Sequence, residues 1–219
     1  DIRSPIPGGY KSGLIWKIGF SPQDIFLGSA DQGNLVIKLW RIIESQGIES
    51  LSSLKEFKGV DLEFIFSKDM SLLIAGTQYS TGYSYIAICD IADLEEIKVL
   101  CRLDKSRGLK TDFGEPRVRS LALSEDKTIL VVGFFAGIQI WNISDPSYPD
   151  KLADLSDDHG FTLALSQDKT LLASGRDCAT TELWNLADLK NTERFSAFGK
   201  PEGKPQGGYY INALQISQD

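Results

Sequence analysis

One short motif recurs along the whole sequence, and this repeat limits the fold more than any other feature does. In each copy an apolar run leads into a polar turn, where aspartate follows serine at the second or third position. The turns begin at Ser21, Ser67, Ser124, Ser166 and Ser217, which lie 42 to 57 residues apart. Serine and aspartate favour turns because their side chains cap backbone N–H groups. A repeat at this spacing predicts an array of similar structural units.

Each unit continues with three further apolar runs. The second run follows the turn directly, at residues 25–27, 72–75, 129–132 and 171–173. The third run ends in one of the pairs Trp40-Arg41, Cys89-Asp90, Trp141-Asn142 and Trp184-Asn185. The fourth run is weaker, at residues 54–57, 97–103, 151–155 and 193–198. Short runs rich in Val, Ile, Leu and aromatic residues, bounded by turns, predict four β-strands per unit.

Four-stranded units in series are typical of β-propeller blades, in which each twisted sheet packs on its neighbours. We therefore predict an all-β chain, a β-propeller fragment with four complete four-stranded blades and the first strand of a fifth. A leading segment at 1–13 precedes the partial propeller at 14–219. The predicted blades are 14–57, 62–103, 118–155 and 160–198, with a begun blade at 210–219. A Greek-key sandwich is the alternative fold, but it would not repeat one motif along the chain.

The fourth unit carries the clearest likeness to a known repeat. Its second and third strands read Leu-Leu-Ala-Ser-Gly-Arg-Asp at 171–177 and Thr-Glu-Leu-Trp-Asn-Leu at 181–186. These segments resemble WD repeats without a gap, and the Phe-Ser-Pro at 20–22 resembles the end of a WD first strand. The likeness extends over 14–219, so the chain resembles the WD-repeat-like β-propeller family. The resemblance implies a module that binds partners.

The repeats also depart from the WD pattern. The Trp-Asp pair of the family is intact in no unit, and its Gly-His pair is missing, although His159 stands near the expected place. The family's buried tetrad of Trp, Ser or Thr, His and Asp is therefore expected to be incomplete in every blade. Cohesion between blades should then depend more on apolar packing.

The segment at 142–149 joins the third and fourth strands of its unit and contains two prolines. It resembles the linker of LVIVD-type propellers, and also occurs in WD arrays attached to bacterial signalling NTPases. Proline restricts the backbone, and Asp145 is expected to cap the bend.

The charge balance bears on the class of partner. The formal net charge is −7 and the pI is near 4.8, which disfavours a nucleic-acid partner because phosphate binding relies on clustered Lys and Arg. A basic run at 102–110 lies beside Phe113, but a solvated loop is the simpler interpretation. No apolar stretch approaches the roughly 18 residues of a membrane span. The chain begins without Met or a signal-peptide pattern, so we expect part of a longer, cytoplasmic protein.

Residues suited to catalysis or metal binding are sparse. A catalytic triad would have to use His159, the only histidine, and no nucleophile stands in an elbow motif. Asp157, Asp158 and His159 form a cluster that is common in solvated turns, and no calcium-loop or P-loop spacing occurs. We expect no catalytic residue, no metal site and no cofactor. The cysteines follow neither a disulfide nor a zinc spacing, and free thiols are expected at Cys89, Cys101 and Cys178.

We therefore predict a non-enzymatic protein-interaction module, the scaffold or sensor part of a larger intracellular protein. Two alternatives stay open. A propeller enzyme or small-ligand receptor would need carboxylates or histidines at the central channel, where first strands such as 121–123 and 163–165 offer apolar residues. A nucleic-acid-binding propeller is disfavoured by the net charge.

The binding face is predicted from where the irregular segments fall. Loops from second to third strands, and loops between units, vary in length, and such variation on one face often marks the functional surface of a repeat protein. Tyrosine and arginine are enriched at interfaces. The candidate partner-binding residues are Tyr79, Tyr83, Arg107, Phe113, Arg117, Phe134, Phe135, Arg176 and Tyr209. For Phe134 and Phe135, packing beneath a loop is equally open. We expect a protein or peptide partner, and self-association through an open blade face.

Overall fold

A computed structural model describes residues 15–20, 26–31, 36–43, 47–54, 61–78, 84–109, 117–134, 137–155, 162–175, 180–199, 211 and 213–216. The described residues form four antiparallel sheets of four strands each. The first sheet holds β1 (Ile15–Phe20), β2 (Phe26–Asp31), β3 (Val36–Ile43) and β4 (Gly47–Leu54). The second holds β5 (Asp61–Phe66), β6 (Leu72–Gln78), β7 (Ser84–Asp90) and β8 (Lys98–Leu103).

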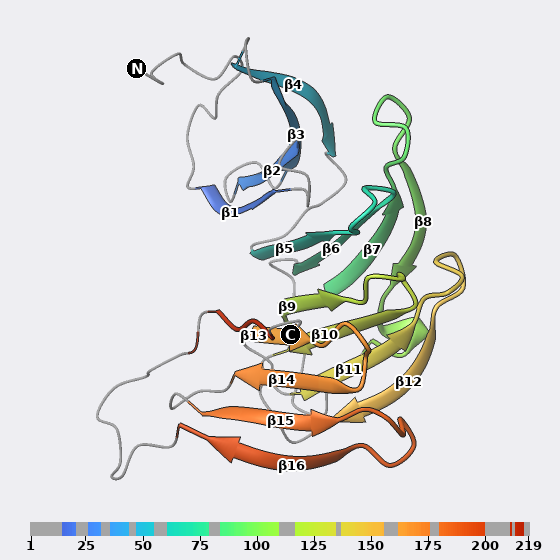
Figure 1. Ribbon diagram of the computed structural model, residues 1–219. Coiled ribbons are helices and arrows are strands. Elements are labelled where there is room, and N and C mark those ends of the chain that lie inside the picture. The colour runs from blue at the N-terminus through green and yellow to red at the C-terminus, as the bar shows by residue number, and fades with distance from the viewer. Residues whose placement is uncertain are drawn as a thin grey trace.

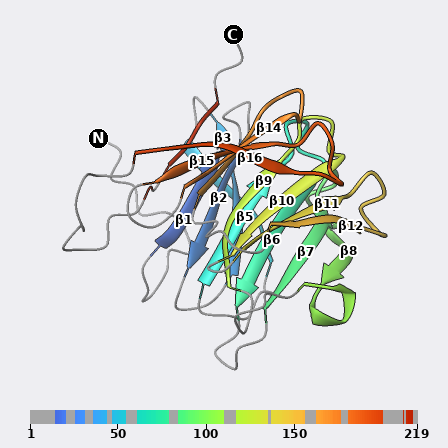
Figure 2. The same ribbon diagram turned by 90° about the horizontal axis from the view of Figure 1, so that it is seen from below.

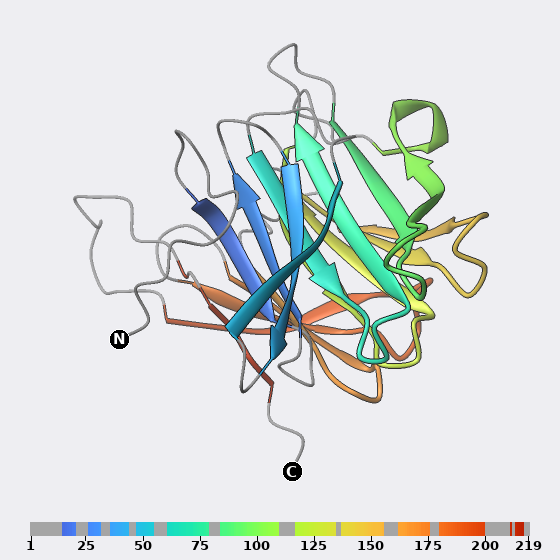
Figure 3. The same ribbon diagram turned by 90° about the horizontal axis from the view of Figure 1, so that it is seen from above.

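The third sheet holds β9 (Val118–Leu123), β10 (Ile129–Phe134), β11 (Gly137–Asn142) and β12 (Asp150–Leu155). The fourth holds β13 (Thr162–Leu165), β14 (Leu171–Gly175), β15 (Thr181–Asn185) and β16 (Glu193–Phe198). A short 3-10 helix, η1 (Lys105–Arg107), follows the second sheet, and it lies at the outer margin of the molecule (Figures 2 and 3).

The strand order within every sheet follows the order along the chain. Figure 1 shows the sheets one after another, from β1–β4 at the top to β13–β16 at the bottom. The first strands of successive sheets are neighbours, since β1 lies next to β5, β5 next to β9, and β9 next to β13. This arrangement, with first strands together and later strands directed outward, is consistent with a propeller-like fold.

The core lies between the sheets because alternate side chains of each strand point to opposite faces. Between the second and third sheets, Ile74, Ile86 and Ile88 pack against Leu130 and Val132 in one buried cluster. A separate cluster fills the space between the third and fourth sheets, where Val131, Ile138 and Ile140 meet Leu163, Leu172 and Trp184. The third sheet is therefore covered on both faces.

Two glycines mark where the next unit packs most closely. A Cβ atom built on Gly76 of β6 would lie 2.6 Å from Val118 Cγ1, at the start of β9. A Cβ atom on Gly175 of β14 would lie 2.9 Å from Ile211 Cβ. Ile211 precedes Ser217 by the same six residues that separate Val118 from Ser124. The residue that opens the fifth repeat therefore packs on the fourth sheet as Val118 packs on the second.

The tryptophans of the third and fourth sheets differ in hydrogen bonding. Trp184 Nε1 donates to Ser174 Oγ at 3.1 Å, and both residues are buried. Trp141 Nε1 is buried and has no hydrogen-bond acceptor among the residues that the structure describes. The residue that pairs with Trp141 from β10 is Leu130, so Val132 stands where Ser174 stands in the fourth sheet. The buried tetrad of Trp, Ser or Thr, His and Asp was expected to be incomplete. In the third sheet it lacks the hydroxyl group, because Val132 occupies the position of the serine.

Every pairing of a third with a fourth strand has a register shift at the same place. The shift falls next to the third-strand Trp or Cys, between Leu39 and Trp40, Ile88 and Cys89, Ile140 and Trp141, and Leu183 and Trp184. A β-bulge of this kind bends the bulged strand and increases its local twist.

The predicted runs match the observed strands except in two places. The fourth strand of the first sheet, β4, begins at Gly47, well before the predicted run at 54–57. Outer strands are exposed on one side, so their apolar pattern is weak. Residues 211 and 213–216 form no strand, because no described strand lies beside them to complete a hydrogen-bonded pair.

Candidate interaction surfaces

The turns between first and second strands are built alike in three sheets. We call residues 67–71, 124–128 and 166–170 the inner turns. In the first of them, Ser67 Oγ accepts a hydrogen bond from Leu72 N at 2.9 Å, and Asp69 Oδ1 accepts one from Ser71 N at 3.1 Å. The same bonds recur at the serine and aspartate of the other inner turns. This is the capping predicted from the Ser-x-Asp motif.

The fourth residue of each inner turn has a left-handed backbone. The φ angles are 59° at Met70, 60° at Lys127 and 65° at Lys169. Residues with a Cβ atom adopt this conformation at a cost. The conformation directs the chain into the second strand and places two lysines at corresponding positions of neighbouring turns.

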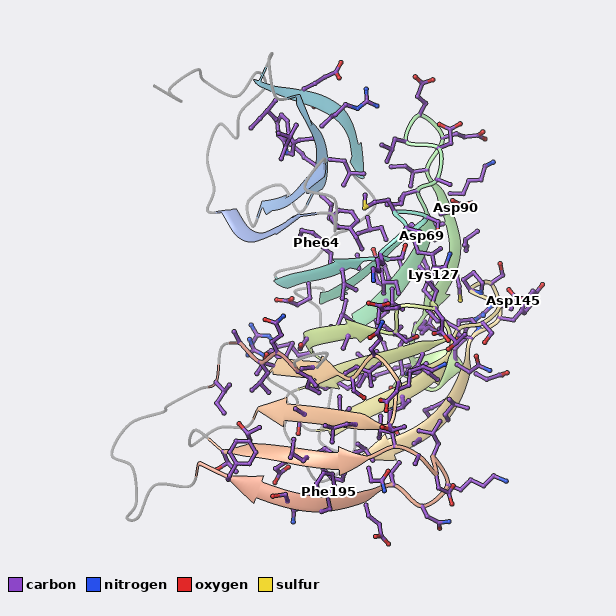
Figure 4. The ribbon with its side chains drawn as sticks, viewed as in Figure 1. Phe64, Asp69, Asp90, Lys127, Asp145 and Phe195 are labelled. Carbon is purple, nitrogen blue, oxygen red and sulfur yellow. The ribbon has the colours of Figure 1, made fainter. Side chains whose placement is uncertain are left out.

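These two lysines connect the sheets. Lys127 Nζ lies 2.5 Å from Asp69 Oδ2 of the preceding inner turn. Figure 4 labels the two residues, which lie near each other. Lys169 Nζ lies 2.6 Å from Asp126 Oδ2. Each lysine also donates to the hydroxyl group at the fifth position of that preceding turn. We call the Lys127–Asp69 and Lys169–Asp126 contacts the turn bridges.

The turn bridges set the charge state of their carboxylates. The bridging lysine is the main cause that holds the pKa of Asp69, and likewise of Asp126, well below the ordinary range. Hydroxyl groups of the same turn act in the same direction. The pKa of Asp168 is lowered as well, but by Ser166 and Thr170 of its own turn. Among the described residues, no lysine bridges to Asp168.

The turns between third and fourth strands form a second uniform set, at residues 90–97, 142–149 and 185–192, which we call the outer turns. Asp145 Oδ1 accepts a hydrogen bond from Ser147 N at 2.9 Å, which confirms the predicted cap. Ile143 is buried, and its N–H donates to the carbonyl of Thr128 in the adjacent inner turn. Inner and outer turns therefore lie together at one end of the strands, which we call the turn side.

The opposite ends of the strands, which we call the loop side, carry the predicted partner-binding segments. Arg107 lies in η1 and is exposed, and its Nη1 donates to Cys101 Sγ at 3.3 Å. Arg117 is half-buried just before β9. The two arginines thus belong to the connection between the second and third sheets. The predicted residues outside the described part of the chain are Tyr79, Tyr83, Phe113, Phe135, Arg176 and Tyr209.

Phe134 does not belong to the predicted surface. Its side chain is fully buried and packs between the second and third sheets with Val132 and Leu130. The alternation of β10 explains this, since all three side chains point to the same face of the strand. Of the two interpretations that were open for Phe134, the structure supports burial, and the side chain packs between two sheets.

Among the described residues, the most exposed large apolar side chains lie in an outer turn and on the outer strand β16. Tyr148 in an outer turn is 74% exposed, and in β16 Phe195 is 59% and Phe198 54% exposed. Phe195 lies on the lowest sheet of Figure 4, beyond which no further sheet is seen. Sequence reasoning missed these residues, although the aromatic content of 193–198 was a usable signal because other outer strands carry Leu there.

Other chemistry is limited in the described part of the chain. Cys89 and Cys101 are buried thiols that take part in no disulfide bond within the described residues, as predicted, and Cys178 lies outside those residues. Across the described ranges, no group of three or more His, Cys, Asp or Glu is arranged to hold a metal ion; His159 is not among them. No helix in those ranges has the length and apolar character needed to cross a bilayer.

Comparisons with known proteins inform the fold. No family model matches the chain, and no curated protein matches it. Solved structures do match, among them the crystal structure of a protein from Lactobacillus plantarum, which is 13% identical with a TM-score of 0.67. The match covers 84% of this chain and 55% of the other, so this chain spans about half the length of that structure. At this level of identity the similarity bears on the fold alone, and it supports the arrangement of the sheets.

Proposed function

We propose that the chain is an arc of a WD-repeat-like β-propeller and works as a non-enzymatic protein-interaction module, the scaffold or sensor part of a larger cytoplasmic protein. The observation that carries the proposal is the contrast between the two ends of the strands. In the second, third and fourth sheets the turn side is uniform, with hydrogen-bonded inner and outer turns repeated from one sheet to the next. The loop side is irregular in sequence length.

Packing between repeated sheets restricts some residues and leaves others free to vary. Side chains between sheets are buried and restricted in shape, and the turn side is held by caps and bridges. Residues on irregular loops of a rigid scaffold can change without cost to the core, and binding residues concentrate there. The exposed Arg107 and the half-buried Arg117 supply the planar, hydrogen-bonding side chain that is enriched at interfaces.

The test identifies the partner by position. A photo-crosslinking amino acid is placed at Arg107 on the loop side and, as the matched variant, at Tyr148 on the turn side. We expect a protein crosslinked reproducibly from Arg107 and not from Tyr148. With that protein purified, alanine at Tyr83, Arg117 and Arg176 should each weaken binding by about 1 kcal/mol or more without a change in melting temperature. Binding that depends on Asp145 to Pro149, and not on the arginines, would contradict the assignment.

A further inference from the structure

The face of the fourth sheet that is turned away from the third sheet has the features of an inter-sheet interface. Trp184 and Leu172 point toward the third sheet, so Leu183 and Ala173 point to the other face, where they pair. Phe198 lies on that face too, because it pairs with Thr181, two residues before Leu183. We call this surface, with Ala173, Leu183, Phe195 and Phe198, the outward face.

The positions equivalent to Phe198 in the second and third sheets are covered. Leu103 in the second sheet and Leu155 in the third pair with their third strands as Phe198 pairs with Thr181. Leu103 is fully buried and Leu155 nearly so, whereas Phe198 is 54% exposed. The counterparts of Phe195 at the bulge are exposed to different degrees, since Leu100 is partly buried against the cluster between the second and third sheets and Leu152 is 38% exposed. Phe198 is therefore the residue that distinguishes the outward face, which has no covering sheet among the described residues.

Two further features of the inter-sheet interfaces recur here: a glycine that contacts the next repeat, and a turn carboxylate that could accept a lysine from the next sheet. The glycine is Gly175, against which Ile211 packs as Val118 packs against Gly76. The carboxylate is that of Asp168. Its counterparts Asp69 and Asp126 each accept a lysine from the next inner turn, whereas Asp168 is reached by no lysine of the described residues.

We propose that the outward face is a docking surface for one more four-stranded sheet of the same repeat type. In this proposal, Asp168 binds a lysine or arginine at the fourth position of the inner turn of that sheet. The outward face continues the pattern of the two inter-sheet interfaces already described, and the carboxylate of Asp168 is complementary in charge to a lysine or arginine. The partner's facing side must be apolar to cover Leu183 and Phe198. This surface is separate from the loop side, so the proposal does not depend on the function proposed above.

The chain itself supplies the probe. Residues 217–219 read Ser-Gln-Asp, as residues 166–168 do. A second copy of residues 169–199 joined after Asp219 therefore continues the fifth repeat in register, with lysine as the fourth residue of its inner turn. The new sheet would end in the same outward face that the chain now exposes, so the extension adds no more apolar surface than it covers.

Hydrogen exchange and a double-mutant cycle test the proposal. In the extended chain we expect amides of β15 and β16 to exchange about tenfold more slowly than in the original chain. Asp168→Asn should lower the melting temperature of the extended chain by more than that of the original chain, where it only weakens the cap of its own turn. An extension that begins with methionine, as at Met70, should reduce the effect of Asp168→Asn to that seen in the original chain.

Three outcomes would overturn the proposal. The first is an extension that stays unprotected from exchange. The second is an equal effect of Asp168→Asn in the original and extended chains. The third is an original chain that forms a dimer by light scattering and becomes monomeric with Phe195→Ser and Phe198→Ser, since a second copy would then be the occupant of the outward face.

Discussion

At the residue scale, the fourth position of the inner turn combines a conformational cost with an electrostatic gain. A left-handed backbone at a residue with a Cβ atom costs on the order of 1 kcal/mol. Lys127 and Lys169 occupy this position and form the turn bridges. The carboxylates are about half exposed, so each bridge contributes less than a buried pair would, about 1 kcal/mol at most.

The first prediction concerns Lys127→Met, which copies Met70 and leaves the backbone conformation unchanged. Because the folded-state pKa of Asp69 is depressed, the bridge stabilises the protein above the ordinary carboxyl pKa, and this contribution is lost as pH falls below about 4. We expect the variant to melt lower than the parent chain at pH 7, and the difference to shrink progressively as the pH falls below about 4 toward the depressed pKa of Asp69. Melting curves across this range, with the exposed Lys190→Met as control, check it. A constant difference at all pH values would contradict it.

The second prediction concerns the Trp184–Ser174 hydrogen bond. Ser174→Ala leaves a buried indole N–H without an acceptor, as at Trp141, and should reduce the free energy of unfolding by about 1–3 kcal/mol. Trp184→Phe in the same chain provides a double-mutant cycle, measured by denaturant unfolding. We expect the serine substitution to cost much less when Trp184 is already replaced. Additive effects would show that the hydrogen bond is not the cause.

At the element scale, strand type and order were predictable because each run is short, apolar and bounded by turns. The second and third strands were located well, for their side chains are buried on both faces. The fourth strands were not, and β4 shows why: its residues 47–50 are exposed, so burial leaves little pattern in the sequence. The turn bridges could not be predicted either, since they depend on how far one sheet is rotated against the next.

The third prediction concerns the packing of β9 on β6. Gly76→Ala would place a Cβ atom against Val118, which is buried and branched at Cβ, and overpacking of this kind typically costs about 1–3 kcal/mol. We expect a lower melting temperature, partly restored when Val118→Ala is added. Calorimetry of the single and double variants provides the measurement. No recovery in the double variant would show that strain within β6 is responsible.

At the scale of the whole molecule, we expect local stability to be higher in sheets that are covered on both faces than in a sheet with one exposed face. The second and third sheets have a buried cluster on each face, whereas the outward face of the fourth is partly exposed. Of the predicted partner-binding set, Arg107 and Arg117 lie on the loop side, and their role in binding stays a prediction. For Phe134 the sequence left burial and exposure equally open, because an aromatic residue at a strand end can point either way and only the register decides.

The fourth prediction follows from this gradient. Amides of β10 and β11 should exchange with solvent more slowly than those of β15 and β16 in the same molecule, because opening the third sheet disrupts two clusters and opening the fourth disrupts one. Hydrogen exchange followed by mass spectrometry measures this on peptides from each strand. Equal rates in the two sheets would mean that the array opens in a single cooperative step.

The register shift beside each outer strand has a consequence for how the molecules meet one another. An unpaired edge strand exposes N–H and C=O groups that can form hydrogen bonds with a strand of another molecule, and such pairing can lead to aggregation. The bulge recurs in all four outer pairings, and it turns part of that template out of line. The outer edge of each sheet is therefore a poorer template for such pairing than a regular strand would be.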